Sequence, residues 1–544
     1  RANFAEIKRE LVSRNWGLDF DKMSVEDAWQ HFKNTVSSLT HRHVPFEKRR
    51  MFSRPPWMTG AASRAVRIKQ RRWASYRSGH TSIDDYKLAE KKAKKELRKS
   101  RRNYEKQLAK EMKRNPRKFY SYVNGKNKRT GIGPLKDADG NILASDREMA
   151  EEFNATFASA FGKNGATQSS PHAPHVTNLL TTIQFPPEVV EHKLRSLKPS
   201  SAPGPDGIHP RLLRECAGEL SIPLSLIFTK SMSESVLPAE WKQTNVSPIY
   251  KKGQKNCAIN YRPINLASVP AKIMESVIKD GILHHLRENK LIRDSQHGFL
   301  PQRSCTTNLI DYLNEVTRSL DAGVSFDAIL VDFQKAFDKV PFDGMLAKAK
   351  AHGIHGELFE WLRNWTENRR QRVVLNGAVS NWADVLSSVV QGSVLGPILF
   401  IIYINDLDEK IKAADDRIYV VKFADDTKLG REIMDPNDSN KLQEGVDNLV
   451  QWCRDWGMAL HPEKCVVLHF GQKNPRNTYF IADTPIKSED VARDLGVHVS
   501  TTCKASAHVD IITKKAHGVL SRIRRATIVR DRSTVTAMYR SFVH

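Results

Sequence analysis

The stretch from Ile418 to Leu429 reads IYVVKFADDTKL, and two adjacent aspartates stand at its centre. A β-branched and aromatic run leads into them, and threonine, lysine and leucine lead out. This pattern predicts a strand, a tight turn at Asp425 and Asp426, and a second strand. Adjacent carboxylates repel each other unless a cation neutralises them. Such pairs are also common in solvated turns, so the stretch alone leaves a metal site and an ordinary turn both open.

The charge of the chain limits its possible partners. Among its 544 residues, 86 are Lys or Arg and 61 are Asp or Glu, which gives a formal net charge of +25. An excess of this size predicts a partner dense in negative charge, either nucleic acid or an anionic membrane surface. The six cysteines form no CxxC pair and no cluster with histidine at zinc-ligand spacing. We therefore expect reduced thiols in an intracellular protein.

No membrane segment is predicted. The chain starts at Arg1 without a signal-peptide pattern, which suggests a fragment of a longer protein. The longest uncharged run, from Val385 to Asn405, is long enough to cross a bilayer. Polar residues and a proline in its first two-thirds instead predict a buried strand, a turn and a helix.

Changes in composition divide the chain into several parts. Residues 1–161 are basic and mostly helical in pattern. Residues 162–178 are rich in Gly, Ser, Pro, His and Thr and predict a linker. From Phe185 onward, apolar strands alternate with amphipathic helices, as expected of an α/β domain. The length of the chain also predicts more than one domain.

The first of these parts contains two clear helix signals. Apolar residues between Tyr86 and Met112 recur at helical spacing on one narrow face, and the other faces are crowded with Lys and Arg. This helix could be a solvated arm of a hairpin or could lie along a phosphate backbone. Ser145 and Glu148 predict a capping box at the start of a later helix.

A third carboxylate is expected to join the central pair. Residues 327–338 read DAILVDFQKAFD, in which a short apolar strand ends at Asp332, 93 residues before Asp425. If the two strands pair in one sheet, three carboxylates converge and can bind two Mg²⁺ ions about 3.5–4 Å apart. Such a site activates an attacking hydroxyl and stabilises the leaving pyrophosphate. Asp338 and Asp343 instead stand where helix starts favour acidic residues.

Several longer motifs resemble those of one family, the reverse transcriptases of LINE-type (non-long-terminal-repeat) retrotransposons, in particular the jockey-like group. The motifs appear in the family's order between about Pro187 and Ser500: LKPSSAPGPDGIHPRLLREC, SPIYKKG, NYRPINLASVPAKIMESVI, QHGFLPQRSCTTNL, DAILVDFQKAFDKVP, SSVVQGSVLGPILFIIYINDL and VKFADDTKL. RDLGVHV, from Arg493 to Val499, resembles the hairpin that grips the primer end.

The resemblance implies a right-hand polymerase of mixed α/β (α+β) class. Residues 187–500 would form the fingers and a ferredoxin-like palm, and residues 501–544 the start of a truncated helical thumb. Residues 1–161 resemble the region that follows an endonuclease in full-length relatives, and no endonuclease is expected here. Residues 162–178 would link this region to the polymerase.

The resemblance also implies roles for particular residues. Asp332 and Asp425 match metal ligands, and Asp426 matches the third carboxylate; two Mg²⁺ ions would be the cofactors, with Mn²⁺ as a possible substitute. Phe337 matches the aromatic gate that excludes a 2′-hydroxyl, although a core phenylalanine is the alternative. Lys464 matches a lysine that would protonate the departing pyrophosphate.

Further matches concern the nucleotide. Gln391 and Gly392 match the turn that lies against nucleotide and template, where a glycine lets the backbone come close. Arg262 matches an arginine that meets the triphosphate, and Lys251 and Lys252 are weaker candidates for the same role. An ordinary surface ion pair is the alternative for Arg262.

The sequence departs from the family near Lys464. The family usually has asparagine where His461 stands and threonine where Cys465 stands. These changes put the positioning of the lysine in doubt more than its identity.

The function implied is RNA-directed DNA synthesis by a retrotransposon enzyme, primed from a target DNA 3′ end. The partners would be element RNA, a DNA primer or target, and dNTPs, with an oligomeric state that the sequence leaves open. The protein would act in the nucleus during integration and assemble with RNA in the cytoplasm. The alternatives are a maturase-like or RNA-templated RNA polymerase, and a catalytically dead RNA-binding remnant.

Overall fold

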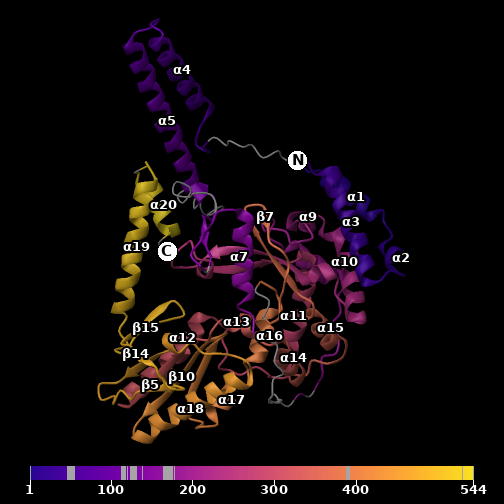
Figure 1. Cartoon of the computed structure of the whole chain (residues 1–544), viewed down its shortest axis with the longest axis vertical. Helices are drawn as coiled ribbons and strands as arrows, with labels where there is room; N and C mark the ends of the chain where they lie inside the picture. Colours follow the sequence, from indigo (N-terminus) through magenta and orange to yellow (C-terminus); the bar gives the residue numbers. More distant parts are fainter. Residues whose placement is uncertain are drawn as a thin grey trace. The chain divides into compact units, whose positions relative to one another are not determined.

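The computed structural model describes residues 2–45, 55–111, 118, 121–122, 132–137, 139–162, 176, 178–387, 392–529 and 531–542. The chain divides into two compact units (Figure 1). The first, here called the mixed unit, comprises Arg1–Pro45 and Ile132–Lys504 and contains both sheets and helices. The second, here called the helical unit, comprises Phe46–Gly131 and Ala505–His544. The predicted α/β class is thus confirmed for the larger unit.

The central sheet of the mixed unit has five strands in the order β14, β11, β5, β10, β9. Their bounds are Lys487–Ser488, Val466–Phe470, Ser325–Val331, Asp426–Ile433 and Tyr419–Phe423. Neighbouring strands are antiparallel except for β11 and β14. Strand β5 lies in the middle and is buried almost throughout its length, which fits the apolar run from Ala328 to Val331. The predicted pairing of β5 with the strand that follows the aspartates is confirmed.

A second five-stranded sheet places β3 (Gln243–Tyr250) between β4 (Tyr261–Leu266) and β6 (Arg370–Leu375), with β7 (Ala378–Val379) beyond β6. A short strand β8 (Ala383–Asp384) also pairs with β6. Helix α7 (Asp146–Ala158) covers this sheet, and its Phe153 ring lies 4.9 Å from the Tyr261 ring. The predicted capping box of Ser145 and Glu148 starts this helix.

One continuous apolar core connects most of the remaining helices of the mixed unit. These helices are α1 (Phe4–Val12), α2 (Trp16–Phe20), α3 (Val25–His43), α8 (Pro187–Arg195), α9 (Pro210–Glu215), α10 (Ala217–Glu234), α11 (Val269–Glu288), α13 (Ala336–Lys339), α14 (Phe342–Ala351), α15 (Gly356–Thr366), α16 (Gly396–Tyr403), α17 (Leu407–Lys412) and α18 (Pro436–Asp455). Helix α12 (Cys305–Asp321) instead joins a smaller core, in which its Tyr312 and Val316 lie with residues of β5 and β11. The N-terminal residues join this core through Trp29, whose indole N–H donates to Glu240 at 3.0 Å and whose ring packs edge-on against Trp241.

Short elements complete the mixed unit. They are β1 (Leu135–Lys136), β2 (Ile142–Leu143), β12 (Phe480–Ile481), β13 (Thr484–Pro485), β15 (Val491–Asp494), β16 (Val497–Ser500) and the 3₁₀ turns Ala239–Lys242, Ala258–Asn260 and Pro462–Lys464. Strands β15 and β16 form the hairpin predicted around Arg493 to Val499.

The helical unit consists of α4 (Gly60–Arg77), α5 (Ile83–Glu111), α19 (Ser506–Ala526) and α20 (Arg532–Phe542). Its small core joins Leu108 and Ala109 of α5 to Ile523, Ala526 and Met538. The helix predicted between Tyr86 and Met112 is therefore confirmed as far as Glu111, because Met112 lies outside the described residues, and it packs against the C-terminal helices.

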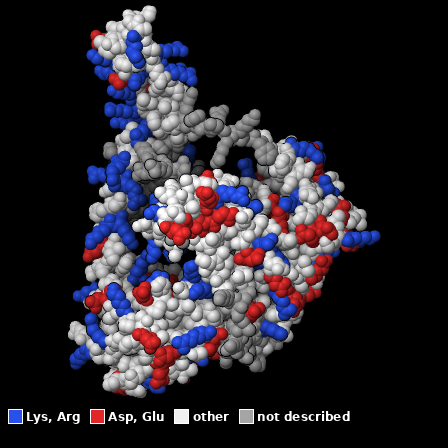
Figure 2. Space-filling model, in the orientation of Figure 1, with Lys and Arg blue, Asp and Glu red and all other residues white. Residues whose placement is uncertain are grey.

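The two units carry very different charge. The helical unit has 36 Lys and Arg against 9 Asp and Glu, a net charge of +27, whereas the mixed unit has 50 against 52, a net charge of −2. Figure 2 shows Lys and Arg side chains gathered along the helices of the helical unit. The whole positive excess of the chain thus belongs to the smaller unit.

The uncharged run from Val385 to Asn405 contains the predicted helix, α16, but the predicted strand does not fall within its described residues. Strand β8 ends one residue before the run, at Asp384. Most of the predicted linker 162–178 lies outside the described residues. No helix among the described residues is long and apolar enough to cross a membrane.

Candidate active site

The two aspartates lie on a hairpin, as predicted, but its two-residue turn is shifted by one residue, so that Asp425 lies in the turn and Asp426 begins β10. Phe423 pairs with Asp426, so Ala424 and Asp425 form the turn, and Ala424 adopts φ 56°. On the other side of β10, Thr427 pairs with Val331. Asp426 and Asp332 are the next residues beyond this pair, so the register brings the strand end and the hairpin tip to the same edge of the sheet.

The segment that precedes α12 supports this hairpin. The carboxamide oxygen of Gln296 accepts the backbone N–H of Ala424 at 2.9 Å and that of Gly298 at 2.7 Å. A Cβ on Gly298 would lie 2.4 Å from the Ala424 nitrogen, so no larger residue fits there. The sequence analysis placed these residues in the family motif QHGFLPQRSCTTNL and missed their contact with the aspartate turn.

The backbone of Asp332 is held by the segment around Lys464. The Asp332 N–H donates to the Cys465 sulfur at 3.3 Å, and the Asp332 carbonyl accepts the His461 N–H at 2.8 Å. The Lys464 ammonium lies 3.4 Å from the Asp332 carboxylate. The segment that carries the two unusual residues, through the His461 backbone and the Cys465 sulfur, therefore places Lys464 beside a predicted metal ligand.

A cleft of about 530 Å³ contains seven of the nine predicted site residues. These are Lys251, Arg262, Asp332, Phe337, Asp425, Asp426 and Lys464. The cleft also contains three cations that the sequence analysis missed, Lys335, Arg369 and Arg370, and a fourth carboxylate, Asp338. A cluster of carboxylates and a cluster of cations thus face one cavity, which is what a metal-bound polyphosphate requires.

The proximity of like charges changes the acidity of these groups. Partial desolvation, reinforced by the Asp425, Asp494 and Asp332 carboxylates, raises the pKa of Asp426 to about 6, although its side chain is partly open to solvent. Burial and then the Asp332 charge raise the pKa of Asp425. Burial, Arg262 and neighbouring lysines lower the pKa of Lys251. Each group would be stabilised by a bound ion of opposite charge.

Phe337 packs partly in the core and partly lines the cleft. Its ring stacks on Phe400 at 4.4 Å and meets Phe299 edge-on at 6.2 Å, so one side belongs to the core. The residue is only half-buried and lines the cleft beside Asp332. This position leaves the ring available to a ligand in the cleft.

The predicted turn at Gln391 and Gly392 is described only in part, because Gln391 lies outside the described residues. Gly392 does not line the cleft. Its φ is 88°, and a Cβ there would lie 2.9 Å from the carbonyl oxygen of Asn265. The glycine is therefore required by contact with the chain's own backbone, whether or not a ligand also approaches.

A second cleft, of about 580 Å³, shares Asp332, Asp426 and Lys464 with the first and extends to the hairpin of β15 and β16. The buried ammonium of Lys428 connects the two sides of this cleft: it contacts the Asp494 carboxylate of β15 at 2.6 Å and the Asn308 side-chain oxygen at 2.5 Å. Lys428 thus ties the strand of the aspartates to the hairpin.

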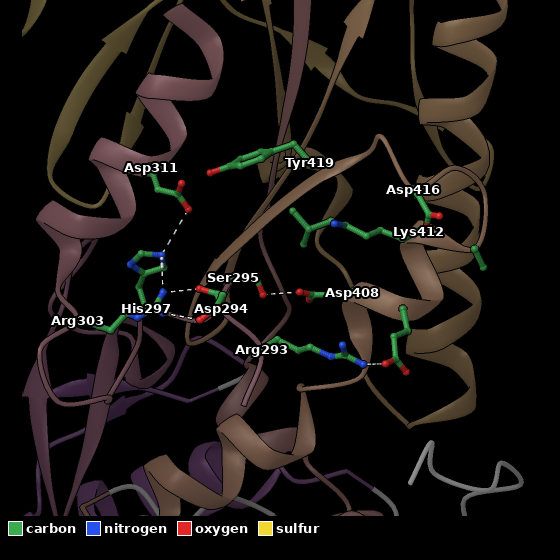
Figure 3. Close-up of a pocket in the computed structure, with 13 residues that line it drawn as sticks. Arg293, Asp294, Ser295, His297, Arg303, Asp311, Asp408, Lys412, Asp416 and Tyr419 are labelled. Carbon is green, nitrogen blue, oxygen red and sulfur yellow. Dashed lines mark hydrogen bonds and ion pairs between the residues drawn. The ribbon is translucent and has the colours of Figure 1, made fainter. Parts of the chain in front are cut away.

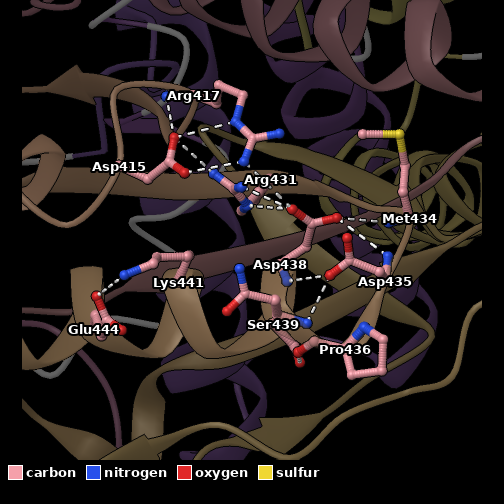
Figure 4. Close-up of polar contacts among 11 residues, drawn as sticks. Asp415, Arg417, Arg431, Met434, Asp435, Pro436, Asp438, Ser439, Lys441 and Glu444 are labelled. Carbon is pink, nitrogen blue, oxygen red and sulfur yellow. Dashed lines mark hydrogen bonds and ion pairs between the residues drawn. The ribbon is translucent and has the colours of Figure 1, made fainter.

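A buried charge network anchors the far end of β10 (Figure 4). The Arg431 guanidinium, 1% exposed, contacts the Asp438 carboxylate of α18 at 2.7 Å and the Asp415 carboxylate at 3.0 Å. Asp435 accepts the backbone N–H groups of Asn437 and Asp438 and caps the same helix. These contacts fix β10 five residues after the aspartate pair.

A larger cavity of about 840 Å³ lies outside this site (Figure 3). None of the predicted site residues lines it. Most of its charged groups pair with one another: Arg293 with Glu409, Arg303 with Asp294, and His297 with Asp311. This internal pairing leaves the cleft at the three aspartates as the better candidate for phosphate chemistry.

The donor set of the site fits hard divalent cations, although the carboxylates are not gathered into a closed metal cluster. Among the described residues, no group of three His, Cys, Asp or Glu side chains is placed to hold a metal ion. Carboxylate oxygens are the ligands that Mg²⁺ prefers, and within the described part of the chain Asp332 forms an ion pair with the partly exposed Lys464 alone. Asp332, Asp425 and Asp426, which line one cleft, are the residues that could hold such ions.

Comparison with known proteins agrees with this geometry. Residues 249–499 match the family described as reverse transcriptase (RNA-dependent DNA polymerase). The chain is 24% identical over 431 residues to the probable RNA-directed DNA polymerase from transposon BS of Drosophila melanogaster, covering 76% of this chain and 47% of that protein. It is 27% identical over 293 residues to the RNA-directed DNA polymerase from mobile element jockey of the same fly, covering 53% and 32%. The chain thus spans less than half the length of these relatives.

Proposed function

We propose that the chain is an RNA-directed DNA polymerase, on the premise that residues 249–499 match the reverse transcriptase family and that the chain is similar to the polymerases of transposon BS and of mobile element jockey. The observation that carries the proposal is the pair of clefts that share Asp332, Asp426 and Lys464. Polymerisation needs a nucleotide on one side of the catalytic carboxylates and a primer end on the other.

The cleft with the cations would take the incoming dNTP. Arg262, Lys251, Arg369 and Arg370 provide charges for the triphosphate. Phe337 would pack on the sugar, where its ring leaves no room for a 2′-hydroxyl. The half-buried ring, fixed against Phe400, has the rigidity that such a steric gate needs.

The cleft bordered by β15 and β16 would hold the primer terminus. The Lys428 contacts to Asp494 and Asn308 support this role, because they couple the hairpin to the catalytic strand. Two Mg²⁺ ions, or Mn²⁺ in their place, would activate the primer hydroxyl and stabilise the leaving pyrophosphate when bound. Asp332 and Asp425 would be indispensable for holding them, and Asp426 less so.

Lys464 would deliver a proton to the departing pyrophosphate. Its ammonium is 3.4 Å from Asp332 and faces both clefts, which supports the role. The contacts of Cys465 and His461 with the Asp332 backbone hold the backbone around Lys464 in place, although these two neighbours are unusual for the family.

In this proposal the mixed unit supplies fingers and a ferredoxin-like palm, and α19 and α20 begin a thumb. The natural primer would be the 3′ end of a target DNA and the template the element's own RNA. This reaction would occur in the nucleus, after assembly with RNA in the cytoplasm. The relatives that suggest these steps are longer than this chain.

Primer extension by the purified chain tests the proposal. We expect a DNA primer annealed to an RNA template to be extended with dNTPs in Mg²⁺ and not in EDTA. Preference for NTPs would instead favour an RNA polymerase. Binding without extension, unaffected by a recessed 3′ end, would indicate an RNA-binding remnant.

A further inference from the structure

The free end of the α4–α5 hairpin carries a cluster of aromatic rings. Helix α4 contributes Trp73 and Tyr76, and helix α5 contributes Tyr86. The Trp73 ring lies 4.8 Å from the Tyr86 ring and 5.8 Å from the Tyr76 ring. We call these three residues the aromatic tip.

Packing within the hairpin leaves much of this cluster open to solvent. Trp73 is 43% exposed and Tyr76 is 37% exposed, although each contacts another ring. The rings therefore hold one another in place through part of their surface and present the remainder outward.

Cations surround the aromatic tip. Residues 60–111 contain 17 Lys and Arg against 6 Asp and Glu, and Figure 2 shows these basic side chains along the hairpin. Lys69 and Arg77 lie four residues before and after Trp73, on the same helix face, and Arg72 directly precedes it. Among the described residues, none of these three cations is paired with a carboxylate.

We propose that the aromatic tip and its flanking cations are a docking surface for the unpaired part of an RNA template. Bases of a single strand can stack on Trp73 and Tyr76 while Lys69, Arg72 and Arg77 contact the phosphates. In a duplex the base faces are already stacked on one another, so a duplex could contact only the cations of this surface. The net charge of +27 on the helical unit fits a polyanionic partner.

This surface lies in the helical unit, outside the two clefts of the mixed unit. The docking proposal rests on the proposed function only in naming the bound RNA as the template, since a polymerase that copies RNA must hold template that is not yet paired. Binding at the aromatic tip needs neither nucleotide nor metal, so it can be measured whether or not the chain synthesises DNA.

The test measures binding of an unstructured 20-nucleotide RNA to the full chain by fluorescence anisotropy, without Mg²⁺ or nucleotide. We expect Trp73→Ala and Tyr76→Ala each to weaken binding at least about fivefold, the lower bound for loss of one stacked base. Trp73→Phe should restore most of the affinity. Leu88→Ala removes a 55% exposed apolar side chain of the same hairpin and is the matched control.

Salt dependence separates stacking from charge. The aromatic variants should keep the wild-type salt slope, whereas Arg72→Gln and Arg77→Gln should each reduce it by about 0.7. Binding of duplex RNA should be unchanged by the aromatic variants. Trp73→Leu, which keeps apolar packing without a ring, should behave like Trp73→Ala if its helicity by circular dichroism is that of the wild type.

Three results would overturn the proposal. The first is wild-type affinity for RNA in the aromatic variants, and the second is an equal loss of duplex binding. The third is a stronger effect of the same variants on another partner: DNA of the same sequence, or vesicles containing phosphatidylserine. Any of these would assign the aromatic tip to hairpin packing or to a different ligand.

Discussion

The mixed unit and the helical unit differ in how they use charge. The mixed unit is nearly neutral overall, with a net charge of −2, and it buries opposite charges against each other, as at Lys428 and Asp494. The helical unit has a net charge of +27 and leaves most of its cations on the surface. Paired charge fixes a geometry, whereas unpaired surface charge attracts a polyanion without specifying its sequence.

This contrast suggests a division of work. Chemistry on phosphate requires carboxylates and cations at fixed positions, which only a packed unit can supply. Retention of a long nucleic acid requires charge spread over an extended surface. Changes in one unit should therefore leave the property of the other unit intact.

The largest expected effect on stability comes from Lys428→Met. This change leaves the Asp494 carboxylate, 5% exposed, without its cation, and should destabilise the mixed unit by about 3–5 kcal/mol. Chemical denaturation of the variant measures this loss. The double variant with Asp494→Leu should recover most of it, and the exposed Lys487→Met should have no effect. Equal stability of Lys428→Met and wild type would show that the pair does not hold β10 to the hairpin.

Glu105→Gln should weaken the helical unit alone. The fully buried Glu105 carboxylate accepts hydrogen bonds from Arg101, Tyr122 and the backbone N–H groups of residues 528 and 529. Loss of its charge should cost about 1.5–3 kcal/mol. Calorimetry should show one transition lowered and the other unchanged, with Glu111→Gln, at a partly exposed carboxylate of the same helix, as the control. A shift of both transitions would mean that the units unfold together.

Gly298→Ala should distort the active-site hairpin. The added Cβ would meet backbone rather than a flexible side chain, so we expect a loss of about 1–3 kcal/mol and a reduced rate of primer extension. Gly133→Ala, where the Cβ meets open space, is the control. RNA binding should be unchanged in both variants. Normal extension by Gly298→Ala would remove this support for the turn.

Phe337→Ala should change selectivity more than stability. Opening the space beside the sugar should raise the ratio of kcat/KM for NTP over dNTP by about tenfold or more. Phe299→Ala, which removes a neighbouring ring that does not line the cleft, should leave the ratio unchanged. An unchanged ratio in Phe337→Ala would indicate a purely structural ring.

The sequence predicted the local elements of the site but few of the contacts that support it. The hairpin at Asp425 and the strand before Asp332 follow from apolar runs and turn residues, which are local signals. The contact of Gln296 with the Ala424 N–H joins residues 128 apart in sequence, and no periodic pattern marks such a pair. The same holds for Lys428 and Asp494, which look like ordinary surface charges until the fold buries them.

The charge separation also escaped the sequence analysis. A net charge of +25 was evident, but the helical unit combines residues 46–131 with residues 505–544, which are far apart in the chain. A charge count along the sequence therefore mixes the two units. The predicted boundaries near residues 161 and 500 follow composition, whereas the units follow packing.

The most direct test of the central claim is primer extension and RNA binding measured side by side on Asp425→Asn. We predict that extension on an RNA template in Mg²⁺ falls below detection while RNA affinity and its salt slope stay at wild-type values. Asp343→Asn, at the start of α14, should retain both properties. Near-normal extension by Asp425→Asn would contradict the assignment of catalysis to the three carboxylates of the mixed unit.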